Sequence, residues 1–181
     1  MKTRLLIEQH MHGAFGIDFN KASVEEMIFV SKELLKLGIG GYFPTLVTDS
    51  VENIIRQTHI IKEASSLLTK DCAEILGIHL EGIFINIEKK GIHNYEHFLP
   101  LTQENFEQLE DDFIKIVTLA PELDEGLLDY LSSKDIKIQA GHCVQCPEPA
   151  GLPAPPGGGR CRHMRPHHVF PYGQNAGRAG H

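Results

Sequence analysis

Residues 76–94, LGIHLEGIFINIEKKGIHN, join an apolar run that is typical of a buried strand to a set of ionisable residues. The run ends at His79 and Glu81, and two lysines and His93 follow within a short distance. A carboxylate at such a place must be ion-paired, hydrogen-bonded or coordinated to a metal. The stretch therefore predicts a buried strand with a polar site at its carboxyl end.

The same alternation of short β-like runs and longer helix-like runs extends on both sides of this stretch, and it predicts a parallel sheet with crossover helices. The expected strands are 4–10, 41–47, 75–80, 115–120 and 136–141. The expected helices are 23–37, 50–68, 103–112 and 123–133. Five such repeats in about 140 residues are typical either of a doubly wound sheet or of the opening part of a (β/α)₈ TIM-like barrel.

The first expected helix has recognisable ends. Ser23 and Glu26 have the spacing of a capping box, and Gly38 is the type of residue that ends a helix. Apolar residues recur between them at helical intervals, so this helix is expected to pack one face on the sheet.

Length and charge limit the class of partner. The 181 residues suffice for one ordinary domain or for part of a larger one. The net charge is −7, and residues 147–181, with four Arg and one Glu, contribute +3, so residues 1–146 carry −10. No basic stripe is present, which argues against nucleic acid, and no run approaches the roughly 18 apolar residues of a membrane span. A cytoplasmic protein that binds a small molecule is expected.

Composition changes abruptly at residue 147, so two segments are expected, 1–146 and 147–181. Pro and Gly dominate residues 147–160, and Ile, Lys and Asp do not occur after residue 146. An amphipathic element cannot be placed there, which predicts an irregular or disordered tail. So sharp a change also suggests aberrant sequence, from a gene junction or a shifted reading frame.

The cysteines do not suggest a disulfide framework, and free thiols are expected. Cys143 and Cys146, with Cys161 and His163, form an incomplete zinc-like pattern, which we keep as an alternative.

Three expected strands end in metal-ligand types: His10 and His12 on the first, His79 and Glu81 on the third and His142 on the fifth. The carboxyl ends of parallel strands gather at one edge, where active sites lie. Imidazole and carboxylate ligands suit zinc or iron, and such an ion activates water for hydrolysis. Structural or exposed histidines remain an alternative for the first strand, and His93 is expected to bind a ligand from a loop over the same edge.

Five stretches of the chain carry a resemblance to a known family. They are HMHGAFGIDFN, YFPTLVTDS, LGIHLEGIFINIEKKGIHN, IVTLAPE and AGH, spread over residues 5–142. In these stretches the chain resembles the N-acetylglucosamine-6-phosphate deacetylase family of the metal-dependent amidohydrolase superfamily. One departure is Ile83, because the family usually has proline after HLEG.

The resemblance implies a partial TIM-like barrel and removal of acetate from N-acetylglucosamine 6-phosphate, giving glucosamine 6-phosphate. It implies that Glu81 and His142 are metal ligands and that His10 and His12 serve a second metal position, so one or two zinc or iron ions are expected. It also implies that Ile92 and His93 contact the sugar phosphate. Asn86 and Lys90 are second choices for that contact.

The remaining family residues are matched weakly. The stretch HHVFPYGQNAGR, residues 167–178, is similar to the family's next motif, which would make His168 a third metal ligand and Arg178 a phosphate contact. Pro171 and Tyr172 replace the family's Asn-Ala pair, and the distance from His142 is a few residues too long.

The resemblance also implies that the chain is truncated. The family's small β-sandwich domain and its acid/base aspartate have no counterpart, so no catalytic residue is assigned. Three hypotheses follow: a deacetylase present as an incomplete copy, a non-catalytic fragment that binds metal or sugar phosphate, and a different amidohydrolase. The non-catalytic fragment would pair with another chain through its open sheet edge, and a homo-oligomer is among the expected partners.

Overall fold

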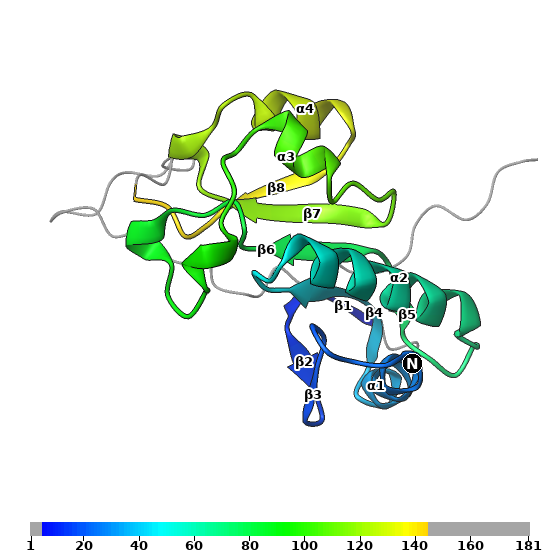
Figure 1. Cartoon of the computed structure of the whole chain (residues 1–181). Coiled ribbons are helices and arrows are strands. Elements are labelled where there is room, and N and C mark those ends of the chain that lie inside the picture. Colours follow the sequence, from blue (N-terminus) through cyan, green and yellow to red (C-terminus); the bar gives the residue numbers. More distant parts are fainter. Residues whose placement is uncertain (1–4, 145–181) are drawn as a thin grey trace, which may run out of the picture.

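The computed structural model describes residues 5–144 of the chain, and Figure 1 shows their path. The predicted tail, residues 147–181, lies outside the described residues. Strands of the main sheet are β1 (Leu6–Met11), β4 (Ile39–Leu46), β5 (Glu74–Ile75), β6 (Ile78–Glu81), β7 (Ile114–Leu119) and β8 (Lys137–Ala140). The α-helices are α1 (Val24–Lys36), α2 (Val51–Leu67), α3 (Gln103–Glu107) and α4 (Leu127–Ser133). No helix in residues 5–144 has the length and apolar character needed to cross a membrane.

The main sheet is parallel, and its strands follow the order β1-β4-β6-β7-β8, with the short β5 paired to β4. A doubly wound sheet reverses its strand order at a switch point, whereas a barrel adds each strand next to the preceding one. The order found here does not reverse. The structure therefore confirms the partial TIM-like barrel and excludes the doubly wound alternative for the described strands.

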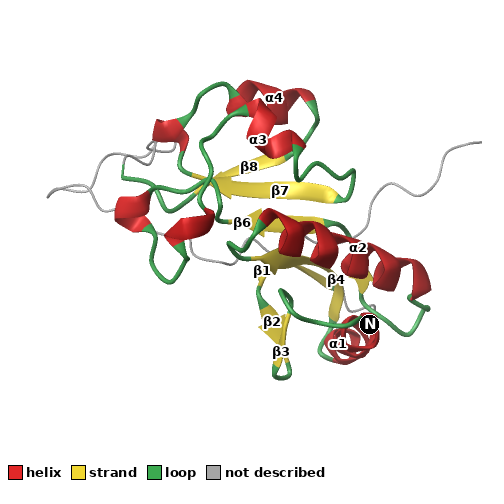
Figure 2. Ribbon diagram, viewed as in Figure 1, coloured by secondary structure: helices red, strands yellow, loops and turns green. Residues whose placement is uncertain are grey.

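Helices cover one side of this curled sheet. Figure 2 shows α1 and α2 beside the β1 and β4 end of the sheet, and α3 and α4 beside the β7 and β8 end. Strand β6 illustrates why: Ile78 and Leu80 belong to the apolar core, while His79 and Glu81 are buried and polar. Successive side chains of a strand point to opposite faces, so the other face of the sheet is left for polar residues.

The predicted ends of α1 are confirmed. Ser23 Oγ accepts a hydrogen bond from the Glu26 backbone N–H at 3.2 Å, and Glu26 Oε2 accepts one from the Ser23 N–H at 2.8 Å. Gly38, with φ of 87°, follows the last turn. A glycine adopts this left-handed conformation without the steric cost that a Cβ adds.

Three predicted elements differ from those observed. Strand 75–80 is divided into β5 and β6 because Gly77 has φ of 145° and a Cβ there would lie 2.9 Å from the Phe113 carbonyl oxygen. Helix 103–112 ends early, at Glu107. Helix 123–133 begins only at Leu127, since Gly126 has φ of 101° and a separate 3-10 turn, η3 (Pro121–Leu123), precedes it.

The remaining elements lie in the connections. The hairpin of β2 (Gly13–Ala14) and β3 (Ile17–Asp18) follows β1. The long connection after β6 contains two short 3-10 turns, η1 (Ile87–Lys89) and η2 (Tyr95–His97). This connection starts at the carboxyl edge of the sheet, where the predicted site residues lie.

Candidate metal centre

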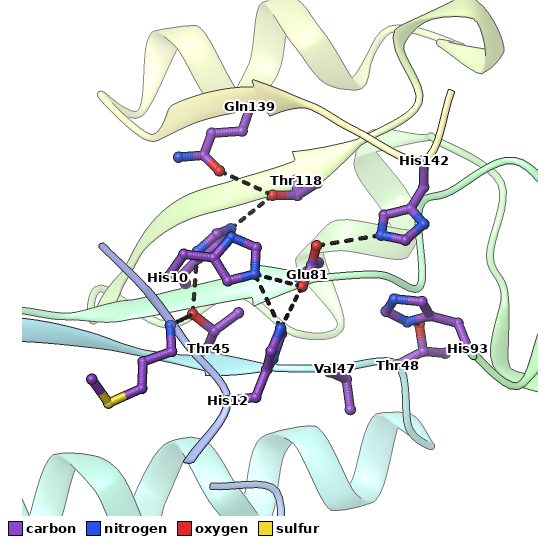
Figure 3. A network of polar contacts seen from close by, with 12 residues as sticks. His10, His12, Thr45, Val47, Thr48, Glu81, His93, Thr118, Gln139 and His142 are labelled. Carbon is purple, nitrogen blue, oxygen red and sulfur yellow. Dashed lines mark hydrogen bonds and ion pairs between the residues drawn. The ribbon is translucent and has the colours of Figure 1, made fainter. Parts of the chain in front are cut away.

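Glu81, the last residue of β6, is the centre of a cluster of histidines at the carboxyl edge of the sheet (Figure 3). Its Oε2 lies 2.9 Å from His10 Nε2 and 3.0 Å from His12 Nε2, and its Oε1 lies 3.3 Å from His142 Nε2. The Nε2 atoms of His10 and His12 are themselves 3.0 Å apart. The structure thus brings together four of the five potential ligands that the sequence places at the ends of three strands.

Hydrogen bonds alone cannot satisfy all the close contacts among His10, His12 and Glu81. If both His10 and His12 donate to Glu81 Oε2, the two ring nitrogens both carry a proton. Neither can then accept from the other, although they lie 3.0 Å apart. If one ring nitrogen accepts from the other instead, it has no proton for the carboxylate. Hydrogen bonding can therefore satisfy at most two of the three close contacts.

The donor atoms fit a divalent cation better. His10, His12 and Glu81 each offer one donor atom, and these atoms lie within 4.8 Å of one another. Donor atoms that share an ion at about 2.1 Å lie about 3.0 Å apart when their bonds are at right angles, and about 3.4 Å apart in a tetrahedron. Two imidazole nitrogens and a carboxylate oxygen are also the donor types that zinc and iron accept.

The electrostatics of the cluster favour an ionised carboxylate. Burial works to raise the pKa of Glu81, but its hydrogen bonds with His10, His12 and His142 outweigh burial and hold this pKa well below its usual range. In the same contacts, the hydrogen bond with Glu81 raises the pKa values of His12 and His142 above their ordinary value. The cluster therefore keeps one carboxylate ionised at a point where a metal cation can compete with the protons of the histidines.

His142 is oriented by the connection that follows β6. Its Nδ1 lies 2.9 Å from the Lys89 carbonyl oxygen, which can only accept, so Nδ1 carries a proton. Nε2 is thereby directed at Glu81, to which it donates when protonated, and it presents a lone pair there when a cation replaces that proton. The Asn86 N–H donates to the His142 carbonyl oxygen at 3.1 Å. His142 itself has φ of 50°, an uncommon conformation for a residue with a Cβ.

His93 lies beside this cluster. It is 6% exposed, its ring stands edge-on to that of His142 with centroids 4.7 Å apart, and its Nδ1 is 2.8 Å from Thr48 Oγ1. Burial, followed by the neighbouring charge of His142, lowers the pKa of His93 to about 4. The predicted ligand-binding histidine is thus a neutral, fixed ring at the edge of the candidate centre.

His79 occupies a deeper position on the same face of β6. Its Nδ1 lies 2.9 Å from the Gln9 carbonyl oxygen and its Nε2 lies 2.7 Å from Thr118 Oγ1, while Thr118 in turn contacts Gln139 at 3.3 Å. Burial lowers the pKa of His79 to about 4. Both ring nitrogens are engaged by protein atoms, so His79, which the sequence offered as a potential ligand beside Glu81, lies in a buried polar row with Thr118 and Gln139 and outside the donor cluster.

The other predicted site residues are placed differently. Ile92 is 94% exposed on the connection after β6. Asn86 donates from Nδ2 to Glu122 Oε1 at 3.0 Å, and the Lys90 ammonium lies 5.6 Å from the centre of the Tyr95 ring. His168 and Arg178, and the alternative site of Cys146, Cys161 and His163, lie outside the described residues.

Two cysteines fall in the described part of the chain. Cys72 is a free thiol, as expected, whereas Cys143 is disulfide-bonded, so the expectation of free thiols is wrong at that position.

Sequence reasoning missed the residues that hold the histidines in place. Thr48, Thr118 and the Lys89 carbonyl each fix one ring nitrogen of a histidine. A signal for Thr48 was present, because it is the polar residue that follows β4 at the same edge of the sheet. A backbone carbonyl such as that of Lys89 leaves no signal in residue type.

Curated proteins that are similar to this chain include N-acetylglucosamine-6-phosphate deacetylases. No protein-family model matches the chain. It is 33% identical over 148 residues to N-acetylglucosamine-6-phosphate deacetylase of Rattus norvegicus and 34% identical over 147 residues to that of Bacillus subtilis. Each match covers 76% of this chain but only 36% of the relative, so the chain spans about a third of the length of these curated relatives.

Solved structures agree with these relatives. The crystal structure of N-acetylglucosamine-6-phosphate deacetylase from Pasteurella multocida matches with a TM-score of 0.67 and 28% identity, over 77% of this chain and 37% of that chain. The enzyme from Thermotoga maritima matches with a TM-score of 0.61 and 29% identity. The resemblance inferred from the sequence is confirmed, as is the small share of the relatives that the chain represents.

Proposed function

We propose that this chain is the metal-binding part of an N-acetylglucosamine-6-phosphate deacetylase, and that its reaction is the hydrolytic release of acetate from N-acetylglucosamine 6-phosphate. The observation that carries the proposal is the convergence of His10, His12 and His142 on the buried carboxylate of Glu81. Identity of about a third to curated deacetylases over 76% of the chain supports the choice of substrate.

In this proposal, a divalent ion, zinc or iron, is held by His10, His12 and Glu81. His142, on the other carboxylate oxygen, completes this site or begins a second one, with His168 as a further ligand, so one or two ions are expected. A bound ion would supply Lewis acidity, which lowers the pKa of water and polarises a carbonyl group. Glu81 contributes its negative charge, and the Lys89 carbonyl keeps the lone pair of His142 Nε2 directed at the site.

The sugar phosphate is assigned to the residues beside the metal ligands. His93, buried and neutral, presents a fixed ring next to His142, while Ile92 and Arg178 are proposed as further contacts. Because Thr48 engages Nδ1, a neutral His93 ring has one nitrogen, Nε2, for a polar group of an N-acetylated sugar.

A second candidate function is a non-catalytic protein that keeps metal or sugar-phosphate binding. It is supported by the described residues, in which the candidate metal ligands lie together and the His93 ring lies beside them. Hydrolysis of an amide needs a group that moves a proton to the leaving nitrogen. We assign no residue to that role in this chain.

Metal content and acetate release together test these functions. The full chain is purified, bound zinc and iron are quantified, and acetate release from N-acetylglucosamine 6-phosphate is measured. Glu81→Gln is compared with Glu104→Gln, which changes an exposed carboxylate on α3. We expect metal in the unchanged chain and in Glu104→Gln but not in Glu81→Gln, with acetate release following the metal.

Each other outcome selects a different reading. Metal without acetate release would favour the non-catalytic protein, and acid release from a different N-acyl substrate alone would favour another amidohydrolase. A folded chain without metal would contradict the deacetylase function and the metal-binding form of the second candidate function.

A further inference from the structure

Thr48, the residue that follows the strand end of β4 by two positions, contacts the candidate substrate-binding histidine. Its hydroxyl oxygen is 2.8 Å from the backbone nitrogen of Ile83 and 2.8 Å from His93 Nδ1. Thr48 is 9% exposed, and Ile83 is fully buried. The hydroxyl therefore has two close protein partners in a place that water hardly reaches.

The number of protons decides the direction of both hydrogen bonds. The Ile83 N–H can only donate, so it occupies a lone pair of Thr48 Oγ1. The single hydroxyl hydrogen then has one partner able to accept it, the lone pair of His93 Nδ1. The opposite arrangement, with His93 Nδ1–H donating, would leave a buried hydroxyl hydrogen without an acceptor and be disfavoured by roughly tenfold or more.

The backbone around this contact is shaped for the close approach. Gly82 has φ of 105°, and a Cβ there would lie 2.0 Å from Thr48 Oγ1 and 2.7 Å from His93 Nδ1. Ile83 has φ of 61°, which is rare for a β-branched residue. Such a conformation persists only where the surrounding structure enforces it.

Ile83 is also the position at which the chain departs from the HLEGP pattern of the family it resembles. Proline has no N–H and holds φ near −65°, so it could neither donate to Thr48 nor adopt the conformation seen here. The N–H that orients the Thr48 hydroxyl therefore requires a residue other than proline at position 83.

We propose that Thr48, with its hydroxyl oriented by the Ile83 N–H, is a positioning residue that fixes the tautomer of His93. In that tautomer Nδ1 accepts from Thr48 and Nε2 carries the proton. Among the residues that the structure describes, Nε2 has no hydrogen-bond partner, so its N–H is free to donate to an acceptor oxygen of a ligand. The identity of that ligand as a sugar phosphate rests on the proposed function, whereas the tautomer does not.

Nitrogen-15 NMR of the full chain tests the tautomer directly. Long-range proton–nitrogen correlations of histidine-labelled protein show which ring nitrogen carries the proton, and the His93→Gln spectrum identifies the His93 signals. We expect a protonated Nε2 and an unprotonated Nδ1 near neutral pH. Thr48→Val, which removes the hydroxyl and keeps the shape, should abolish this pattern, while Thr48→Ser should retain it.

Ile83→Gly serves as a further control, because it keeps the N–H and relieves the positive φ, and it should also retain the pattern. Thermal melting of each variant verifies the fold. A protonated Nδ1 in the unchanged chain would overturn the proposal, as would an unaltered pattern in Thr48→Val or a lost one in Thr48→Ser. Zinc content of the same samples tests the proposed function separately, because Thr48 is not among the assigned ligands.

Discussion

Two groups of polar side chains lie on the same face of the sheet and have different hydrogen-bond balances. In the deeper polar row, the two ring nitrogens of His79 meet one carbonyl and one hydroxyl, so each has a complementary partner. At the edge, two residues further along β6, three histidines converge on the single carboxylate of Glu81. Histidine is present in both groups, but the balance of donors and acceptors around it differs.

This difference separates a structural histidine from a candidate ligand. A buried histidine whose two nitrogens are both satisfied stabilises the fold and gains nothing from a cation. In the edge cluster, nitrogen lone pairs and carboxylate oxygens compete for the same protons, and a bound cation would satisfy all of them. The four predictions that follow test this distinction, from the largest expected effect to the smallest.

The largest effect is expected for His79→Ala. The substitution removes two buried hydrogen bonds and leaves a cavity among Thr45, Thr118 and the backbone of β1, which should lower the free energy of unfolding by roughly 4 kcal/mol. Urea denaturation measures this loss. His59→Ala, at an exposed position of α2, is the matched control and should change stability by less than about 0.5 kcal/mol. A small effect at His79 would contradict the idea that a buried histidine with two satisfied nitrogens stabilises the fold.

Acid should destabilise the metal-free protein because the buried His79 ring binds a proton more readily in the unfolded chain. The pKa of His79 is lowered to about 4 in the folded chain, from an ordinary value of 6.5, because the ring is buried. The unfolded chain therefore binds this proton first as the pH falls. The contribution is fully present above pH 6.5 and is lost between pH 6.5 and 4, by about 3 kcal/mol.

Urea midpoints in the presence of a chelator, measured from pH 7.5 to 4, report this loss. The variant His79→Gln does not titrate in this range, so the difference between it and the unchanged chain isolates the histidine. Parallel pH profiles for the two proteins would show that His79 is not the group responsible.

His12→Ala should have the opposite signature. The His12 side chain is 45% exposed and contacts Glu81 and His10, so its removal should cost the metal-free protein little stability. Loss of one of three donors should weaken metal binding by at least about 100-fold. Competition with a chelator of known affinity measures this change, and an unchanged affinity would exclude His12 from the ligand set.

The smallest effect is expected far from both groups, at the start of α1. Ser23→Ala removes the capping hydroxyl and should lower the free energy of unfolding by about 1 kcal/mol, because the Glu26 N–H loses its partner. Metal content should not change. A loss of metal here would indicate that site and scaffold are coupled more tightly than the contacts suggest.

Much of the scaffold was predictable because its signals are local. The capping box of Ser23 and Glu26, the stop at Gly38 and the period of the apolar residues placed α1 within one residue at each end. The same kind of pattern indicated five parallel strands. It did not reveal the break at Gly77, because that break depends on the Phe113 carbonyl, which is distant in the sequence.

The site was predictable in its members and less so in its contacts. His10, His12, Glu81 and His142 could be grouped because parallel strands end at a common edge. Their hydrogen bonds are set by partners such as Thr48 and the Lys89 carbonyl, which come from other elements. Which histidine is a donor, which is an acceptor and which is satisfied follows only from those distant partners.

The unreversed strand order has a consequence for synthesis on the ribosome. Each strand of the main sheet pairs with one that has already emerged, so the sheet can grow in the direction of translation without waiting for later segments. His10 in β1 and His12 just after it emerge first, but the carboxylate of Glu81 emerges about seventy residues later, with β6. We therefore expect the nascent chain to acquire its fold progressively and its affinity for metal in a single late step.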